Sequence, residues 1–301
     1  MTKGNAMSKA RPRRSVLYMP GSNARALEKA KTLAVDCLIL DLEDAVAPEA
    51  KSEAREKVAQ AVRDGGYGRR EVIVRINGLD TEWGADDLAA AVPAGPDGLL
   101  VPKVSSASDV RNACAALDKA GAPKSMRLWA MMETPRAMLD ALAIAEASAE
   151  PSSRLDCLVM GTNDLAKDTG AQLTEDRMSV LAWLSTCVAA AAAHGLTILD
   201  GVYNNFRDTD GFAAECKQGR VLGMDGKTLI HPNQIEVCNT TFSPDEAELE
   251  RARKILEAFE RPENAGKGVI TVDGRMVERL HAESAAKMVV VADAIADIEC
   301  E

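Results

Sequence analysis

The sequence predicts an α/β protein, a (β/α)8 TIM barrel with a C-terminal helix–hairpin–helix lid extension. Two observations favour the barrel. Short apolar runs alternate with amphipathic helical patterns along most of the chain, which indicates buried parallel strands joined by helices. Nearly every run also ends in a charged or polar residue. The interior of such a barrel is packed with side chains, so its chemistry collects at the carboxyl ends of the strands.

The expected strands are the apolar runs between the helical patterns. They cover residues 15–19, 37–40, 71–76, 99–101, 127–132, 155–160, 197–199 and 221–224. We expect one helix to be capped by Ser22 and to end near Leu33, and another to open at Pro48 and stop at Gly65–Gly66. An open doubly wound sheet is the structural alternative. It would confine binding residues to one switch point, whereas here they follow almost every strand.

The pattern changes after residue 232, and this change sets the predicted domain boundaries. The expected parts are a disordered tail (1–13), the barrel (14–240) and the lid extension (241–301). Within the extension, the sequence predicts a charged helix from Ser243 to Glu260, a polar hinge (261–268), a hairpin with its turn at Asp273–Gly274, and a final helix over 276–296. A short β-segment between two helices, placed after a complete barrel, fits a lid.

Composition excludes several classes of protein. The net charge is −10, and no Lys/Arg tract occurs beyond Arg11–Arg14, so a nucleic-acid partner is not expected. No stretch approaches the ~18 apolar residues of a membrane span, and the N-terminus lacks the apolar region of a secretory signal. The seven cysteines form no C-x-x-C pair, which favours reduced, buried thiols. We therefore expect a cytoplasmic protein without membrane partners.

Two acidic residues at neighbouring strand ends are the candidate metal ligands. Glu133 follows the strand at 127–132, and Asp164 lies just past the strand at 155–160. Two carboxylates, waters and a bidentate substrate would complete the octahedron that Mg²⁺ requires, with Mn²⁺ as a substitute. The chain has only three histidines and no tight His/Cys spacing, which argues against zinc. Asp164 has a structural alternative, since it could cap the following helix.

A second charged group follows the earlier strands. Asp41, Glu43 and Asp44 are three acids within four residues, and such a cluster is costly unless a cation lies near. They could bond metal-bound waters, hold an active-site arginine, or lie in a solvated loop. Arg75 ends the third strand, and its planar guanidinium suits a carboxylate or an enolate oxygen; an ion pair with Glu43 or Asp44 is compatible with that role. Lys103 could bind a substrate anion or pair with the same acids.

Six motifs, in order along the chain, resemble the HpcH/HpaI aldolase and citrate lyase β-subunit family, in particular its malyl-CoA-lyase-like members. They are Leu42-Glu-Asp-Ala-Val, Val74-Arg-Ile-Asn, Val101-Pro-Lys, Met132-Glu-Thr-Pro, Gly161-Thr-Asn-Asp-Leu and Ile230-His-Pro-Asn-Gln-Ile. The resemblance runs from Arg14 to the final helix. It implies the barrel, a C-terminal lid, use of Mg²⁺, and assembly as a homotrimer or hexamer.

The resemblance also implies roles for individual residues. Glu133 and Asp164 would be the metal ligands, and Arg75 would contact the substrate carbonyl or enolate oxygen. Glu43 and Asp44 join Arg75 as catalytic candidates. The remaining substrate-binding candidates are Lys103, Asp41, Asn77 and His231, the last of these near the adenosine end of CoA.

A lid residue completes the implied site. Relatives carry an aspartate in a Gly-x-Met-[Ile/Val]-Asp motif that is supplied by a neighbouring subunit. The matching stretch here is Gly274-Arg-Met-Val-Glu278, so the acid is one methylene longer. Glu278 would act as the general acid.

The implied activity is that of a Mg²⁺-dependent CoA-ester lyase. It would cleave malyl-CoA, methylmalyl-CoA or citramalyl-CoA reversibly into acetyl- or propionyl-CoA and a 2-oxoacid (glyoxylate or pyruvate) by retro-Claisen chemistry. The alternatives are a citrate lyase β-subunit acting on a carrier-protein thioester, a malyl-CoA thioesterase, a CoA-independent aldolase and a catalytically silent CoA-ester-binding protein. The lid helix argues against the CoA-independent aldolase. The intact Arg75, Glu133 and Asp164 argue against a silent protein.

Overall fold

The computed structural model describes residues 11–299. The chain forms two compact units, one made of Arg13–Phe242 and the other containing the segment from Ser243 onward. Most of the expected N-terminal tail lies outside the described residues. Its last residue, Arg13, belongs to the first unit, where it is buried and its Nε donates to Glu71 at 2.7 Å.

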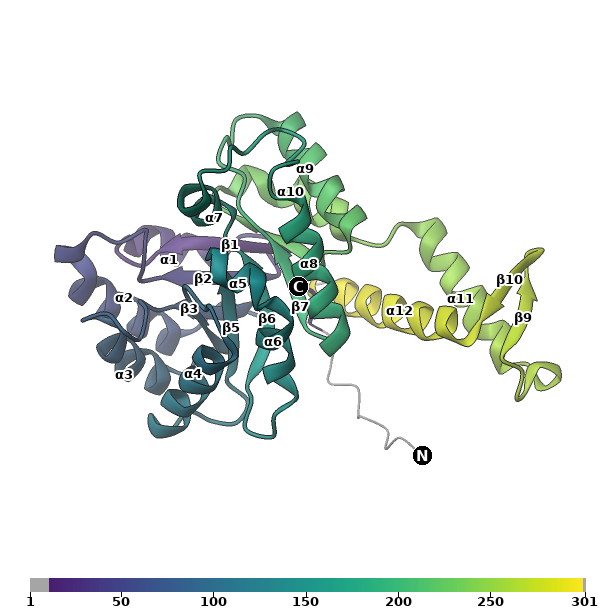
Figure 1. The fold of residues 1–301 in the computed structure, drawn as a ribbon, viewed down its shortest axis with the longest axis horizontal. Helices are drawn as coiled ribbons and strands as arrows, with labels where there is room; N and C mark the ends of the chain where they lie inside the picture. The colour runs from purple at the N-terminus through teal and green to yellow at the C-terminus, as the bar shows by residue number, and fades with distance from the viewer. Residues whose placement is uncertain (1–10, 300–301) are drawn as a thin grey trace. The chain divides into compact units, whose positions relative to one another are not determined.

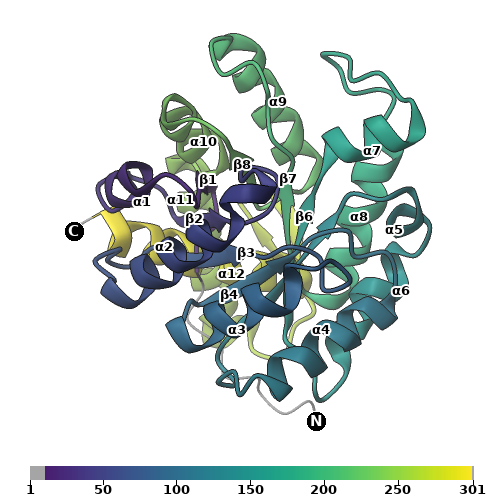
Figure 2. The ribbon, with the colours of Figure 1, turned by 90° about the vertical axis from the view of Figure 1, so that its left-hand side faces the viewer.

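The first unit is a closed barrel of parallel strands (Figures 1 and 2), as the sequence predicts. The strands, in their order around the barrel, are β1 (Ser15–Pro20), β2 (Cys37–Asp41), β3 (Glu71–Arg75), β4 (Gly98–Val101), β5 (Arg127–Met132), β6 (Leu155–Met160), β7 (Thr197–Asp200) and β8 (Gly226–Leu229). β8 pairs with β1 in parallel and closes the barrel. The open doubly wound sheet is thereby excluded.

Helices connect the strands and surround them in Figure 2. The α-helices are α1 (Ala24–Ala30), α2 (Lys51–Asp64), α3 (Gly84–Ala94), α4 (Ala107–Lys119), α5 (Pro135–Leu139), α6 (Ala141–Glu146), α7 (Thr162–Thr169), α8 (Leu181–His194), α9 (Thr209–Leu222) and α10 (Ile235–Phe242). Short 3-10 turns are η1 (Pro48–Ala50), η2 (Ala147–Ala149) and η3 (Pro232–Gln234).

Alternate residues of strands β1 to β7 build two different layers of core. One set fills the barrel interior and consists of Val16, Cys37, Ile39, Ile73, Leu100, Trp129, Met131, Cys157, Val159 and Leu199. The other set packs outward with the helices in the larger core. Burial on both faces explains why the strands read as continuous apolar runs instead of alternating ones. The six cysteines within the described residues are all buried free thiols, in agreement with the expectation.

The predicted eighth strand is wrong. Residues 221–224 contain the end of α9 and its C-cap Gly223, whose φ is 97°, and the true strand follows at Gly226–Leu229. Lys227 and Thr228 make this strand polar, so it does not read as an apolar run. A Cβ at Gly226 would collide with the backbone carbonyl oxygen of Arg13, which explains the glycine there.

Three helices also differ from expectation at their boundaries. Asn23, not Ser22, caps α1, because its side chain accepts a hydrogen bond from the N–H of Ala26, and α1 ends at Ala30. The turn opened by Pro48 precedes α2, which stops at Gly65 as predicted. The last helix starts at Arg279, because the residues before it pair with a strand.

The second unit contains the predicted helix, hairpin and helix in that order (Figure 1). Its elements are α11 (Glu246–Glu260), η4 (Pro262–Asn264), β9 (Val269–Val272), β10 (Arg275–Glu278) and α12 (Arg279–Glu299). Asp245 and Glu248 form a capping box at the start of α11. Asp273 and Gly274 have φ of 49° and 73°, the positive values that a tight hairpin turn requires. The role of this unit as a lid stays a prediction.

A buried charged cluster joins β7, β8 and α9. Lys227 Nζ donates to Asp200 Oδ2 at 3.0 Å and to Glu215 Oε1 at 2.7 Å, and Arg177 Nη1 donates to Asp200 Oδ1 at 2.7 Å. Burial alone would raise the pKa of Asp200, but the charges of Lys227 and Arg177 outweigh it and hold that pKa below its usual range. Asp200 therefore keeps its negative charge inside the protein.

We predict that Lys227→Met lowers the free energy of unfolding by about 3–5 kcal/mol, because it leaves buried carboxylates short of a cation. Urea denaturation measures the loss. Lys217, an exposed lysine on the same helix α9 as Glu215, supplies the control, and Lys217→Met should change stability by less than about 0.5 kcal/mol. Equal losses in the two variants would contradict a specific role for the cluster.

Candidate active site

Arg75 is the centre of a charged group at the carboxyl ends of β2 and β3. Its Nε donates to Asp41 Oδ1 at 2.7 Å and its Nη2 to Asp41 Oδ2 at 2.6 Å. The third nitrogen, Nη1, lies 2.8 Å from Glu43 Oε2. Arg75 and Asp41 are both buried. The two-point contact fixes the plane of the guanidinium, so Asp41 positions Arg75 in this structure.

Tyr18 covers one face of the same guanidinium. The Arg75 Cζ atom lies 4.8 Å from the centre of the Tyr18 ring, and the Tyr18 hydroxyl donates to Met131 Sδ at 3.5 Å. Burial raises the pKa of Tyr18 far above its usual value, although Arg75 opposes the shift, so the phenol stays neutral. Sequence reasoning missed Tyr18. The available signal was its position two residues after Val16 in β1, which places both side chains inside the barrel.

Glu43 is buried, whereas its neighbour Asp44 is exposed. Burial raises the pKa of Glu43 to about 7; the charge of Arg75 opposes this shift and that of Asp44 adds to it. Glu43 Oε2 accepts no aligned hydrogen bond in spite of its short distance to Arg75. The Asp44 side chain is 65% exposed and lies 3.5 Å from Arg75 Nη1. Glu43 is therefore the acid of this pair that can exchange a proton near neutral pH.

Glu133 and Asp164 are brought together by Lys103. The Lys103 N–H donates to Glu133 Oε1 at 2.8 Å, and the Lys103 ammonium donates to Asp164 Oδ1 at 3.1 Å. Burial raises the pKa of Glu133 to about 6; the Lys103 N–H opposes this shift and the charge of Asp164 adds to it. Asp164 lies in the first turn of α7, whose N-cap is Gly161. It is therefore not the cap of that helix, the structural alternative that the sequence left open.

The carboxylate pair fits a hard divalent cation. Within residues 11–299, no three His, Cys, Asp or Glu side chains gather as a complete metal cage. Mg²⁺ does not need one, because it is bound through one or two carboxylates and fills its other positions with waters and substrate. Glu133 offers a buried carboxyl with a raised pKa. Its side chain faces Gly161, where a Cβ would lie 2.7 Å from Glu133 Oε2 and still closer to Glu133 Cβ. The glycine leaves space beside the second carboxylate oxygen.

Asn77 and His231 make local contacts. The Asn77 amide donates to the carbonyl oxygen of Leu42 at 2.9 Å and to Asp87 Oδ2 at 2.6 Å. His231 accepts from the N–H of Asn233 at 3.2 Å, and its ring stacks on Phe206 at 4.5 Å between centroids. These contacts hold the loops that follow β3 and β8. Substrate binding by either residue stays a prediction.

Glu278 belongs to the second unit. It ends β10, and its N–H donates to His281 Nδ1 at 2.9 Å. Its role as a general acid stays a prediction.

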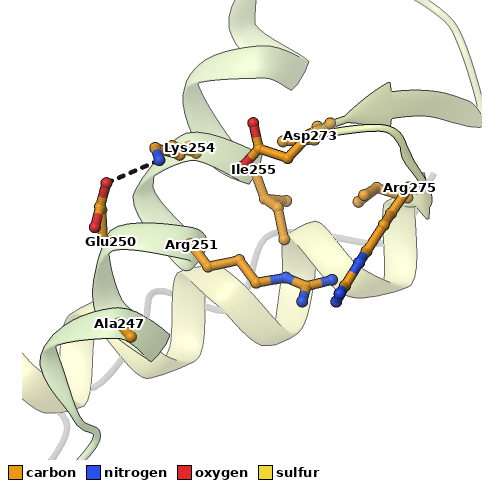
Figure 3. A pocket seen from close by; sticks show the side chains of 9 residues that line it. Ala247, Glu250, Arg251, Lys254, Ile255, Asp273 and Arg275 are labelled. Atoms are coloured by element: carbon orange, nitrogen blue, oxygen red, sulfur yellow. Dashed lines mark ion pairs between the residues drawn. The ribbon is translucent and has the colours of Figure 1, made fainter.

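The second unit has a pocket of about 330 Å³ between α11 and the hairpin (Figure 3). Arg251 and Arg275 extend toward one another at one end of it, and Glu250 pairs with Lys254 at 2.8 Å. Glu278 and the strand-end residues of the barrel are absent from the pocket lining.

The closed barrel, with two acids and a fixed arginine at its strand ends, defines an enzyme whose site lies at the carboxyl ends of the strands. The chain belongs to the HpcH/HpaI aldolase/citrate lyase family, whose model matches residues 14–232. The family resemblance drawn from the six motifs is confirmed.

Curated relatives cover nearly the whole chain. It is 52% identical over 287 residues to a (3S)-malyl-CoA thioesterase of Cereibacter sphaeroides, covering 95% of this chain and 97% of the relative. It is 36% identical over 271 residues to citrate lyase subunit beta of Haemophilus influenzae, covering 88% and 92%.

Solved structures agree with the fold. CitE of Mycobacterium tuberculosis, in complex with magnesium, acetoacetate and coenzyme A, matches with a TM-score of 0.71 at 29% identity, covering 94% of this chain and 98% of that one. RipC of Yersinia pestis matches with a TM-score of 0.65 at 31% identity, covering 78% and 97%. Among the described residues, no helix has the length and apolar character to cross a membrane.

We predict that Gly161→Ala weakens Mg²⁺ binding by about tenfold or more, because the added methyl group displaces the Glu133 carboxylate, and loss of ligand positioning costs 10–100-fold in metal affinity. Isothermal titration of the protein with MgCl₂ measures the affinity. Gly268 is the control, because a Cβ there meets nothing within 4 Å, and Gly268→Ala should leave the affinity unchanged. Wild-type affinity in Gly161→Ala would refute this account of the glycine.

Proposed function

We propose that this protein is a Mg²⁺-dependent hydrolase of malyl-CoA-type thioesters, releasing malate and free CoA. The observation that carries the proposal is the pair of acids Glu133 and Asp164, joined by Lys103 at 2.8 and 3.1 Å, beside the fixed guanidinium of Arg75. The similarity to the (3S)-malyl-CoA thioesterase of C. sphaeroides, 52% over nearly the full length of both chains, supports hydrolysis as the reaction.

Glu133 and Asp164 would hold the Mg²⁺ ion. When bound, Mg²⁺ acts as a Lewis acid toward the oxygen atoms of the substrate. Arg75 faces the position where negative charge develops on the thioester carbonyl oxygen. Because Asp41 fixes its plane and Tyr18 covers one face, Arg75 needs little reorganisation as the charge grows.

Glu43 supplies the proton transfers. Its carboxylate takes a proton from a water molecule as the water oxygen bonds to the thioester carbon. The carbon–sulfur bond then breaks, and Glu43 returns the proton to the departing CoA sulfur. A pKa of about 7 suits a group that must both accept and donate a proton near neutral pH.

Carbon–carbon cleavage is the second candidate, favoured by the acid retained at Glu278 and by the 36% identity to citrate lyase subunit beta of H. influenzae. In that reaction the substrate hydroxyl passes its proton to the Glu43 carboxylate, the C2–C3 bond breaks, and a 2-oxoacid leaves. Arg75 stabilises the thioester enolate, and Glu278 protonates it. The Mg²⁺ requirement and the role of Arg75 are the same for both reactions.

One assay separates the two reactions. Protein with Mg²⁺ is given (3S)-malyl-CoA, β-methylmalyl-CoA and both citramalyl-CoA enantiomers. A thiol reagent reads free CoA, and phenylhydrazine traps any 2-oxoacid. We expect thiol release from malyl-CoA without a hydrazone, and its loss with EDTA or in Glu133→Ala. A hydrazone without thiol would establish carbon–carbon cleavage instead. Neither signal, from folded protein, would overturn the proposal and favour a carrier-protein thioester as substrate.

The pH profile tests Glu43. Because burial raises its pKa to about 7, the carboxylate that acts as base forms as the pH rises through 7, so kcat/KM should rise to a plateau above that pH. Glu43→Gln should lower kcat by about 10²–10³-fold and remove this dependence. Asp44→Asn, the same change at the exposed neighbour, should keep the limb and move it to lower pH, because the charge of Asp44 adds to the upward shift of the Glu43 pKa. A pH limb near 7 that survives in Glu43→Gln would assign the proton transfer to another group.

A further inference from the structure

Lys103 has an unusual backbone conformation. Its φ is 54°, and within the described residues only Arg177 and Asp273 are other non-glycine residues with positive φ. A side chain in this region costs about 1 kcal/mol or more unless the surroundings hold it there. Strained backbone of this kind clusters at functional sites, where the surrounding contacts hold it.

The conformation gives Lys103 two separate contacts. Its backbone N–H reaches Glu133 Oε1 at 2.8 Å, while its side chain reaches Asp164 Oδ1 at 3.1 Å. The turn is held on its other side too, because Ser105 Oγ donates to the Lys103 carbonyl oxygen at 3.0 Å. Ser105 Oγ also lies 2.8 Å from Thr134 Oγ1, next to Glu133 in the chain. Hydrogen bonds on both sides fix the peptide N–H against the carboxylate.

The side chain of Lys103 is much less constrained than its backbone. It is 56% exposed, and that of Asp164 is 23% exposed. An exposed ion pair of this kind contributes little stability, so the ammonium can leave Asp164 at small cost. Arg75 is engaged by Asp41 and Glu43, and the Lys103 ammonium is the cation in contact with Asp164.

We propose that Lys103 has two separable functions at this site. Its backbone N–H positions Glu133, and its ammonium is an exchangeable cation that competes with Mg²⁺ for Asp164 and, once displaced, binds the anionic part of the thioester substrate. The inference rests on the proposed function for the assignment of Glu133 and Asp164 as the metal pair. Two cations on one carboxylate repel one another, so occupancy by one lowers the affinity for the other.

Opposite shifts in Mg²⁺ affinity test the two functions. Lys103→Met removes the ammonium and keeps the N–H, and we expect it to bind Mg²⁺ about two- to tenfold more tightly. Lys103→Gly, which also relieves the strained backbone, should bind at least as tightly as wild type. Ser105→Ala loosens the turn and should bind several-fold more weakly. Isothermal titration of the full chain with MgCl₂, without substrate, gives the affinities.

Matched controls make the result specific. Lys167 is an exposed lysine on α7, the helix of Asp164, and Lys167→Met should leave the Mg²⁺ affinity unchanged. Unchanged or weaker binding in Lys103→Met would overturn the competition. Wild-type affinity in Ser105→Ala would overturn the positioning role. Mg²⁺ binding that survives in Glu133→Ala would place the failure in the proposed function itself.

A kinetic split tests the substrate contact. At saturating Mg²⁺, Lys103→Met should raise KM for the thioester about tenfold with a smaller effect on kcat, and Lys103→Arg should restore KM by returning the positive charge. A wild-type KM in Lys103→Met, with tighter Mg²⁺ binding retained, would remove the substrate contact from the proposal and leave the competition standing.

Discussion

The buried ion pair between Asp41 and Arg75 is the interaction on which the candidate site depends. The two residues are direct neighbours in the parallel register of β2 and β3, so the sheet itself places the carboxylate against the guanidinium. The two-point contact then orients Arg75, which in turn sets the environment of Glu43 and of the Tyr18 ring. Removing one partner would leave a buried charge uncompensated, at a cost of about 3–5 kcal/mol.

Charged clusters also occur at other points of the barrel wall. Arg13, whose guanidinium carbon lies 4.7 Å from the centre of the Trp129 ring, bonds Glu71 and Asp156. Lys227 and Asp200 form the cluster that joins β7 and β8. Between these clusters the interior is apolar. Such buried pairs give little net stability, because desolvation offsets their attraction, but each specifies which strand ends meet.

The sequence could predict the barrel because seven of its strands are apolar on both faces. It also indicated Glu133 and Arg75 as strand-end residues, because a charged residue at the end of an apolar run is a visible signal, whereas Asp164 lies beyond the strand, in the first turn of α7. The eighth strand was not predicted because Lys227 lies inside it and interrupts the apolar pattern. A lysine can be buried in a strand only when carboxylates neutralise its charge, and the carboxylates that do so here lie on other elements.

Other features could not be predicted from local sequence patterns, because they depend on partners that the patterns do not reveal. The ring of Tyr18 matters because Arg75, far along the chain, stacks on it. Asn77 has its contacts on Asp87 and on the backbone, which no strand-end pattern indicates. The positive φ of Lys103 depends on hydrogen bonds from Ser105 and to Glu133, so the residue type alone gives no sign of it. Each of these properties depends on contacts in the folded protein, and each involves at least one residue ten or more positions away in the chain.

The choice between hydrolysis and carbon–carbon cleavage reduces to the route of one proton. Both reactions place negative charge on the thioester oxygen, which Arg75 can stabilise. In the proposed hydrolysis, water must reach Glu43, whereas in the proposed cleavage water must stay away until the enolate has been protonated. Water access is thus the variable that would decide between the two reactions.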